Sequence, residues 1–174
     1  LTTKAWKDRR LTHHFDWVPP DVQYHAFDIP YHNAMPTRER FWSFFRFAVR
    51  VVETGLRLPR PDLIIGSSTP LSSAAPAALT AHLRGVPWIF EVRDLWPDFP
   101  VQMGALPSLL QPPLYALETA LYRSAAHIVT ASPDMEQHVD AKAPATPVTT
   151  IEYGTDRSLL PAAPDDSIRD ELGL

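Results

Sequence analysis

The chain has 174 residues, 45% of them hydrophobic, which is enough for one domain with a substantial apolar core. Its formal net charge of −4 excludes a general attraction to nucleic acid or anionic lipid, so any such binding has to be local. The sequence contains no cysteine, which excludes disulfides, thiolate metal sites and cysteine nucleophiles, and which suits a reducing cytoplasm.

The first strong element in chain order is an amphipathic helix over residues 37–60, preceded by a weaker strand signal over residues 22–29. The apolar stripe of this helix consists of Phe41, Phe44, Phe45, Ala48, Val52 and Leu56. Arg46, Arg50 and Arg57 line up on nearly the opposite side. This arginine row is compatible with a solvated face or with a contact to phosphate or lipid headgroups.

From Asp62 onward, short apolar runs alternate with helical patterns. Strands are predicted over residues 62–68, 87–92, 127–132 and 147–153. Helices are predicted over residues 71–85, 109–125 and 133–142. This alternation predicts right-handed βαβ crossovers, and continuous apolar strands are typical of a sheet covered on both sides. The sequence therefore predicts an α/β fold with a parallel sheet and helices on both faces.

Polar side chains gather where the predicted strands end. In a parallel sheet all the C-terminal ends lie on one edge, and in open α/β folds ligands bind at that edge. The candidates there are Ser67, Ser68, Thr69, Arg93, Asp94, Trp96, Asp98, Thr130, Ser132, Glu152, Tyr153, Gly154, Thr155 and Asp156. Because neighbouring strands are roughly 4.8 Å apart, these side chains would line a single cleft. The sequence thus predicts a ligand site at this edge.

Each candidate also has a structural interpretation. The serines that end the first strand could cap the following helix, which is compatible with anion binding at its N-terminus. Ser132 could be the N-cap of the helix over residues 133–142. Arg93 and Asp94 could form an ion pair that holds the loop, and Trp96 could be a buried anchor for it.

Several other kinds of chemistry lack support in the sequence. It contains no G-x-G-x-x-G, G-x-x-x-x-G-K-[ST] or G-x-S-x-G motif. The sequence therefore gives no support for a dinucleotide-binding fingerprint, a P-loop NTPase or a hydrolase with a nucleophile elbow. The seven histidines show no spacing that pairs ligands on one element, so we expect no metal site. No apolar run approaches the roughly 20 residues that cross a bilayer, so we expect a soluble or peripheral protein.

Three segments resemble a known family. They are "PDLIIGSSTPLSSAAPAALTAHLRGVPWIFEVRDLWPDFPVQMGAL", "ALYRSAAHIVTASPDM" and "IEYGTD". Together they resemble the N-terminal domain of family 4 retaining glycosyltransferases, especially bacterial enzymes of exopolysaccharide, capsule and O-antigen assembly. The resemblance runs from about Pro61 to Asp156, over half of the chain.

The resemblance implies one half of a GT-B fold, in which two Rossmann-like domains face each other across a cleft. The N-terminal domain holds the acceptor and the C-terminal domain holds the nucleotide-sugar donor. We therefore expect residues 1–160 to form a Rossmann-like acceptor domain whose start is missing, and residues 161–174 to lead into an absent donor domain. No cofactor is expected, because the nucleotide sugar is a substrate.

The resemblance also suggests roles for single residues. Many relatives have a histidine where this sequence has Arg93, which cannot act as a base at neutral pH but can fix a phosphate or a sugar hydroxyl. Asp94 could orient Arg93 or accept a hydrogen bond from the acceptor hydroxyl, and Tyr153 replaces a residue that is often asparagine. The residues expected to bind substrate are Ser67, Ser68, Thr69, Trp96, Asp98, Ser132, Gly154 and Asp156. Those expected to contact lipid phosphate are Trp42, Arg46 and Arg50.

The sequence thus points to the acceptor domain of a retaining glycosyltransferase that acts in polysaccharide biosynthesis. Its expected partners are a nucleotide-sugar donor and a glycan or polyprenyl-pyrophosphate-linked acceptor, without nucleic acid. We expect a cytoplasmic location, with peripheral contact to the inner face of the cell membrane. Two alternatives stay open: a non-catalytic Rossmann-like module that binds sugar or protein, and another GT-B enzyme such as a sugar epimerase.

Overall fold

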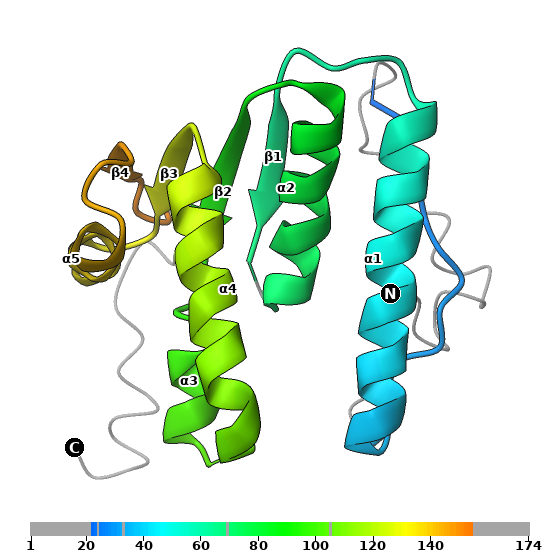
Figure 1. Cartoon of the computed structure of the whole chain (residues 1–174), viewed down its shortest axis with the longest axis horizontal. Coiled ribbons are helices and arrows are strands. Elements are labelled where there is room, and N and C mark those ends of the chain that lie inside the picture. Colours follow the sequence, from blue (N-terminus) through cyan, green and yellow to red (C-terminus); the bar gives the residue numbers. More distant parts are fainter. Residues whose placement is uncertain (1–21, 24, 33, 69, 105, 155–174) are drawn as a thin grey trace, which may run out of the picture.

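The computed structural model describes residues 22–154 except residues 24, 33, 69 and 105 (Figure 1). The strands are β1 (Ile64–Ser67), β2 (Trp88–Val92), β3 (His127–Thr130) and β4 (Val148–Thr150). The helices are α1 (Thr37–Arg57), α2 (Leu71–Arg84), α3 (Asp98–Gln102), the 3-10 helix η3 (Ser108–Leu110), α4 (Gln111–Ser124) and α5 (Pro133–Lys142). The four predicted strands from residue 62 onward and their connecting helices are confirmed.

The segment over residues 22–29, for which a strand was predicted, is not a strand in the described residues. Helix α1 lies between this segment and the described sheet (Figure 1), so the segment does not extend that sheet. The ring of Phe27 instead packs on α1, where it meets the ring of Phe47 edge-on at a centroid distance of 6.0 Å. Among the described residues of this segment only Ile29 is buried and Phe27 half-buried, so its strand-forming residues do not make up the buried face of a strand.

The four strands form one parallel sheet in the order β1-β2-β3-β4. The register places Ile64 beside Trp88, Ile89 beside His127 and Ile128 beside Val148. This confirms the α/β class and a Rossmann-like parallel sheet. Because every crossover moves to the next strand in the same direction, and crossovers are right-handed, the connecting helices have to lie on the same side.

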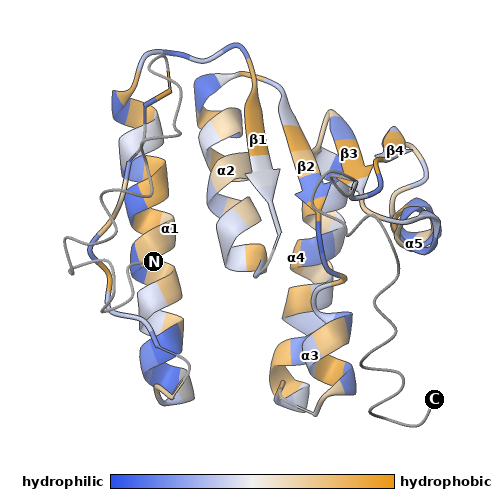
Figure 2. Cartoon of the chain, turned by 180° about the vertical axis from the view of Figure 1, so that it is seen from behind, coloured by the Kyte–Doolittle hydropathy of each residue, from blue (hydrophilic) through white to orange (hydrophobic). Residues whose placement is uncertain are grey.

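The described helices accordingly cover one face of the sheet, where helices on both faces were expected. In Figure 2 the strands lie in front of α2 and α4. Burial alternates along β2, with Trp88, Phe90 and Val92 buried and the residues between them half-buried. On the other face Ile65 is 66% exposed. An apolar strand pattern does not distinguish a strand covered on both sides from one covered on a single side.

The hydrophobic core lies between the sheet and α2, α4 and α5. The ring of Phe90 stacks on Trp88 at a centroid distance of 5.3 Å and packs at a tilt against Tyr122 of α4 at 5.6 Å. Helix α2 approaches β1 closely, because a Cβ on Gly66 would lie 2.7 Å from the Cβ of Ala77. The close approach of α2 therefore leaves no room for a side chain at Gly66.

Helix α1 is an outer helix that packs along α2 (Figure 1). Part of its predicted apolar stripe is exposed, including Phe41, Phe45 and Leu56. The reason is geometric: α2 covers one side of α1 and residues 27–31 cover another, as the contact between Tyr31 and Phe44 shows. The remaining side of the helix has no neighbour among the described elements.

Candidate functional site

Ser68, which is 4% exposed, follows β1 and connects the C-terminal end of β1 to the turn after β2. Its N–H donates to the carbonyl of Glu91 at 2.9 Å, and its Oγ accepts from the N–H of Arg93 at 3.0 Å. The same hydroxyl lies 3.5 Å from the carbonyl of Asp94. Ser68 therefore shapes the turn that follows β2, and its hydroxyl is used inside the protein.

Arg93 leaves this turn as an exposed side chain and reaches the segment after β4. Its Nε donates to the Oη of Tyr153 at 3.2 Å, and its Cζ lies 5.9 Å from the centroid of the Tyr153 ring. The hydrogen bond to Tyr153 and the nearby carboxylate of Glu91 raise the pKa of Arg93 above its usual value. The guanidinium is thus a fixed positive charge on the C-terminal edge of the sheet, and Tyr153, instead of the Asp94 carboxylate, is its hydrogen-bond partner.

Asp98 belongs to a different group of side chains, which joins α3, α4 and α5. Its carboxylate accepts a short hydrogen bond from the Tyr115 hydroxyl. It also lies 3.4 Å from Nε2 of His138 and 4.0 Å from Nζ of Lys142. These contacts tie the start of α3, and with it the loop that carries Arg93, to the two following helices.

The centre of that group is Glu118 of α4, which sequence reasoning missed. Its side chain is 0% exposed, and Nζ of Lys142 lies 2.6 Å from its Oε2. The Tyr122 hydroxyl donates to Oε1 at 3.0 Å, and His138 lies 3.2 Å from the same oxygen. A signal for it was present in the sequence, because Glu118 falls inside the helical apolar stripe, four residues after Leu114.

The two tyrosines of this group are held in their neutral form. Its hydrogen bond to Asp98 raises the pKa of Tyr115 to about 12. Burial, followed by the charge of Glu118, raises the pKa of Tyr122 well above its usual range. Both phenols therefore act as hydrogen-bond donors to carboxylates, which is a structural role.

At the third strand end, Ser132 is the N-cap of α5, as its structural interpretation predicted. Its Oγ accepts from the N–H of Met135 at 3.4 Å. Beside it, the hydroxyls of Thr130 and Thr150 lie 3.0 Å apart, and Thr150 also donates to the carboxylate of Glu136. This polar group links β3, β4 and α5, and Glu136 was not singled out from the sequence.

Of the other predicted residues, Trp96 is half-buried and packs against the core, which agrees with an anchor for the loop. The Oγ of Ser67 lies 3.5 Å from the carbonyl of Ser68. Gly154 is exposed. Thr69 and Asp156 lie outside the described residues. Within residues 22–154, no group of three or more histidine or acidic side chains is arranged to hold a metal ion.

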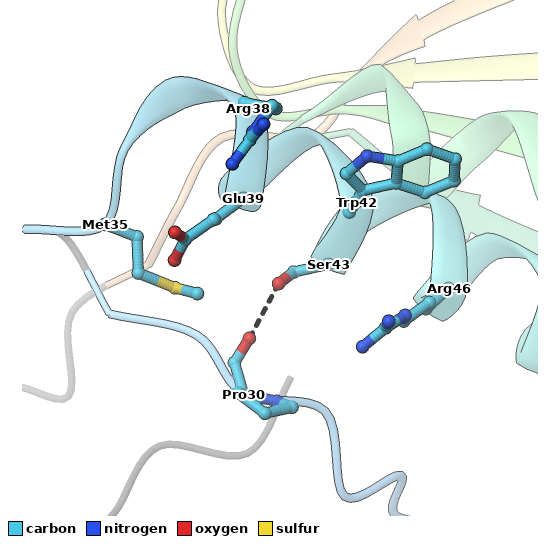
Figure 3. Close-up of a pocket in the computed structure, with 7 residues that line it drawn as sticks. All are labelled: Pro30, Met35, Arg38, Glu39, Trp42, Ser43 and Arg46. Carbon is cyan, nitrogen blue, oxygen red and sulfur yellow. Dashed lines mark hydrogen bonds between the residues drawn. The ribbon is translucent and has the colours of Figure 1, made fainter.

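Two hollows lie away from this edge. One lies between residues 30–35 and the first turns of α1, where Arg38, Trp42 and Arg46 line it (Figure 3). There Ser43 donates to the carbonyl of Pro30 at 2.7 Å. The other lies at the opposite end of the sheet, beside Arg123 and residues 143–147.

Comparison with protein families adds the decisive observation to this geometry. The family described as "Glycosyl transferase 4-like domain" matches residues 2–154. The chain belongs to this family. A glycosyltransferase-type function follows, and a parallel Rossmann-like sheet with its charged C-terminal edge is consistent with half of a GT-B fold. A search of the curated proteins finds no match.

In this glycosyltransferase domain the structure brings together only part of the predicted site. Ser67, Ser68, Arg93 and Asp94 lie at the joined ends of β1 and β2, and Tyr153 reaches them from beyond β4. Asp98 and Ser132 belong to the two structural groups described above. None of the helices in the described part of the chain combines the length and the apolar character needed to cross a membrane.

Proposed function

We propose that this domain is the acceptor side of a retaining glycosyltransferase of polysaccharide biosynthesis, of the kind that assembles exopolysaccharide, capsule or O-antigen. It would transfer a hexosyl or N-acetylhexosaminyl group from a nucleotide sugar to a glycan or polyprenyl-pyrophosphate-linked acceptor. Residues 1–160 would form the acceptor domain, and residues 161–174 would lead into the donor-binding domain. The observation that carries the proposal is the permanently charged Arg93, held at the C-terminal edge of the parallel sheet in a family 4 domain.

Arg93 has donors to offer a ligand. Its Nε is used by Tyr153, while the two terminal nitrogens have no hydrogen-bond partner among the described residues. A guanidinium in this state can bind a phosphate or two sugar hydroxyls with parallel N–H groups. Tyr153 fixes its orientation, which lowers the entropy that Arg93 loses when a ligand binds.

Asp94 follows Arg93 in the same turn and is proposed to accept a hydrogen bond from the acceptor hydroxyl. The hydroxyl would then attack from the face on which the nucleotide leaves, and the leaving phosphate would take its proton, without an obligatory metal. The domain would thus contribute positioning and electrostatic stabilisation. Ser67, Thr69, Trp96, Gly154 and Asp156 would line the acceptor path.

The test is a donor and acceptor screen with the full-length protein, followed by analysis of the anomeric configuration of the product. Arg93→Ala is expected to lower turnover by about 100-fold, the usual effect of removing one hydrogen-bond donor to developing charge. Asp94→Asn should also lower it. Arg123→Ala, an exposed arginine at the far end of the sheet, is the control and should have no effect.

Three outcomes would contradict the proposal. Full turnover in folded Arg93→Ala and Asp94→Asn proteins would mean that the site lies elsewhere. An inverted anomeric product, or epimerised sugar, would indicate another GT-B enzyme. Sugar binding without any transfer would indicate a non-catalytic module.

A further inference from the structure

Helix α1 carries a row of exposed apolar side chains that no described element covers. Phe41 is 64% exposed, Trp42 51%, Phe45 51% and Val49 47%. We call these four residues the aromatic face of α1. Their spacing places them on one side of the helix, and the Trp42 ring meets the rings of Phe41 and Phe45 edge-on at 6.2 and 5.6 Å. Contiguous apolar patches of this kind mark interaction sites on soluble domains.

Two cations border the aromatic face. Arg38 and Arg46 have no hydrogen-bond or ion-pair partner among the described residues, and both line the hollow beside Trp42 (Figure 3). Glu39 lines the same hollow, so its three charged side chains sum to one positive charge. Arg38 and Arg46 thus attract anions, and they lie beside the aromatic face, which favours an apolar environment.

Arg50, which was expected to contact phosphate, is already engaged. Its Nη1 lies 3.0 Å from the carboxylate of Glu53, and Arg57 pairs with the other oxygen of the same carboxylate at 3.0 Å. The two exposed arginines share one carboxylate, so it balances one of their two positive charges. The two arginines that line the hollow beside the aromatic face, Arg38 and Arg46, are therefore the cations considered for binding a partner.

We propose that the aromatic face of α1 docks the domain on an anionic membrane surface. The choice of a membrane rests on the proposed lipid-linked acceptor, and the pattern of exposed aromatic side chains bordered by arginines supports it independently. Phe41, Trp42 and Phe45 enter the boundary between headgroups and acyl chains, and Arg38 and Arg46 bind lipid phosphates. A helix with Trp and Phe on one face and Arg at its border is typical of an interfacial helix.

A second copy of this chain is a poorer occupant of the same surface. In a symmetric dimer the same patch faces itself, so two hollows that each carry a net positive charge would be brought together and repel each other. An anionic bilayer instead complements both arginines while it covers the aromatic rings. Charge complementarity therefore favours the membrane.

The test is flotation of the full-length protein with vesicles of phosphatidylcholine alone and with an equimolar mixture of phosphatidylcholine and phosphatidylglycerol. We expect flotation with the mixed vesicles, and weaker flotation as salt is added. The double variant Arg38→Glu/Arg46→Glu should lose at least about 25-fold in affinity, since each lost cation near the surface costs about fivefold. The triple variant Phe41→Ser/Trp42→Ser/Phe45→Ser should lose binding to the mixed vesicles.

Matched controls come from the same molecule. Leu109 is 84% exposed, and Arg123 is exposed at the other end of the domain, so Leu109→Ser/Arg123→Glu should float like the wild type. All of the substituted side chains are exposed, so the variants should keep the circular dichroism spectrum and melting temperature of the parent.

Two results would overturn the proposal. One is no flotation of the full-length protein with anionic vesicles, or flotation that the aromatic and arginine variants keep. The other is a concentration-dependent dimer that the aromatic substitutions abolish while vesicle binding is unaffected, which would assign the surface to a second copy. Neither readout depends on sugar transfer, so failure of this proposal is distinguishable from failure of the proposed function.

Discussion

Replacing Lys142 with methionine should destabilise the domain more than any other single loss of a charge described above. The substitution removes the ammonium group that lies 2.6 Å from Glu118, whose side chain is 0% exposed. Removing one partner of a buried ion pair costs about 3–5 kcal/mol, because the other charge is left in a low-dielectric interior. The Tyr122 hydroxyl and His138 still contact Glu118 at 3.0 and 3.2 Å, so we expect the lower end of this range, about 3 kcal/mol.

Urea unfolding followed by circular dichroism measures this loss directly. In a thermal scan, a loss of about 3 kcal/mol corresponds to a fall of roughly 6–12 °C in the melting temperature for a chain of this size. Arg57→Met is the control, because it breaks an exposed pair with Glu53 and should cost less than about 1 kcal/mol. The double variant Glu118→Gln/Lys142→Met should be more stable than Lys142→Met alone, since no buried charge is then left over.

The reasoning would be refuted by a loss below about 1 kcal/mol in Lys142→Met. It would also be refuted if the double variant were less stable than Lys142→Met. Either result would mean that Glu118 is not held as a charged group by Lys142.

Two more predictions concern packing and pH. Gly66→Ala should lower the free energy of unfolding by about 1–3 kcal/mol, because its Cβ would lie 2.7 Å from the Cβ of Ala77. Gly154→Ala is the control, because a Cβ there meets no atom within 4 Å and should not change the stability. Equal stabilities of the two variants in urea would contradict the close approach of β1 and α2. Because the pKa of Tyr115 is raised to about 12, the unfolded chain loses this proton first, near pH 10. The stability that Tyr115 contributes is therefore complete below about pH 10 and is lost as pH rises to about 12. Tyr115→Phe should flatten the fall in urea midpoint across this window, and an unchanged slope would argue against the bond to Asp98.

The four strands and the helices α2, α4 and α5 were predictable because local signals coincide there, whereas the short helix α3 and the first residue of η3 lie in a segment predicted as a loop. Gly85 ends α2 in the left-handed conformation, with φ of 61°, as a glycine after a helical pattern indicates. Ser132 followed by Pro133 opens α5 as an N-cap and first-turn proline do. These signals act within a few residues, so they depend little on the rest of the fold.

The tertiary arrangement was less accessible, because it depends on which surfaces meet. The strand order puts the described helices on one face of the sheet, and no apolar pattern records that order. The exposure of Phe41 and Phe45 has the same origin, since helical spacing places them on one side without saying whether another element covers it. Glu118 stands among the apolar residues of its helix, but its partner Lys142 is 24 residues away, so the sequence did not reveal the pair.

At the candidate site, the sequence located the edge but not the contacts. Strand ends and the topology of a parallel sheet were enough to bring Ser68 and Arg93 together. They could not show that the Ser68 hydroxyl is used by the backbone of the next turn, or that Arg93 turns to Tyr153. Side-chain direction at a turn is set by local packing, which a single sequence does not reveal.

The contact between Arg93 and Tyr153 makes the orientation of Arg93 depend on β4, the strand at the end of the described sheet. The two residues are 60 positions apart, and Tyr153 is held by the chain that leaves β4, an edge strand of three residues. Short edge strands open at a lower free energy than the strands of a core. Detachment of β4 would leave the domain folded and Arg93 charged, but without the group that orients it. The domain can thus lose its ability to bind a ligand while it remains folded. Hydrogen exchange at the backbone amides of β4 measures the opening that causes this loss.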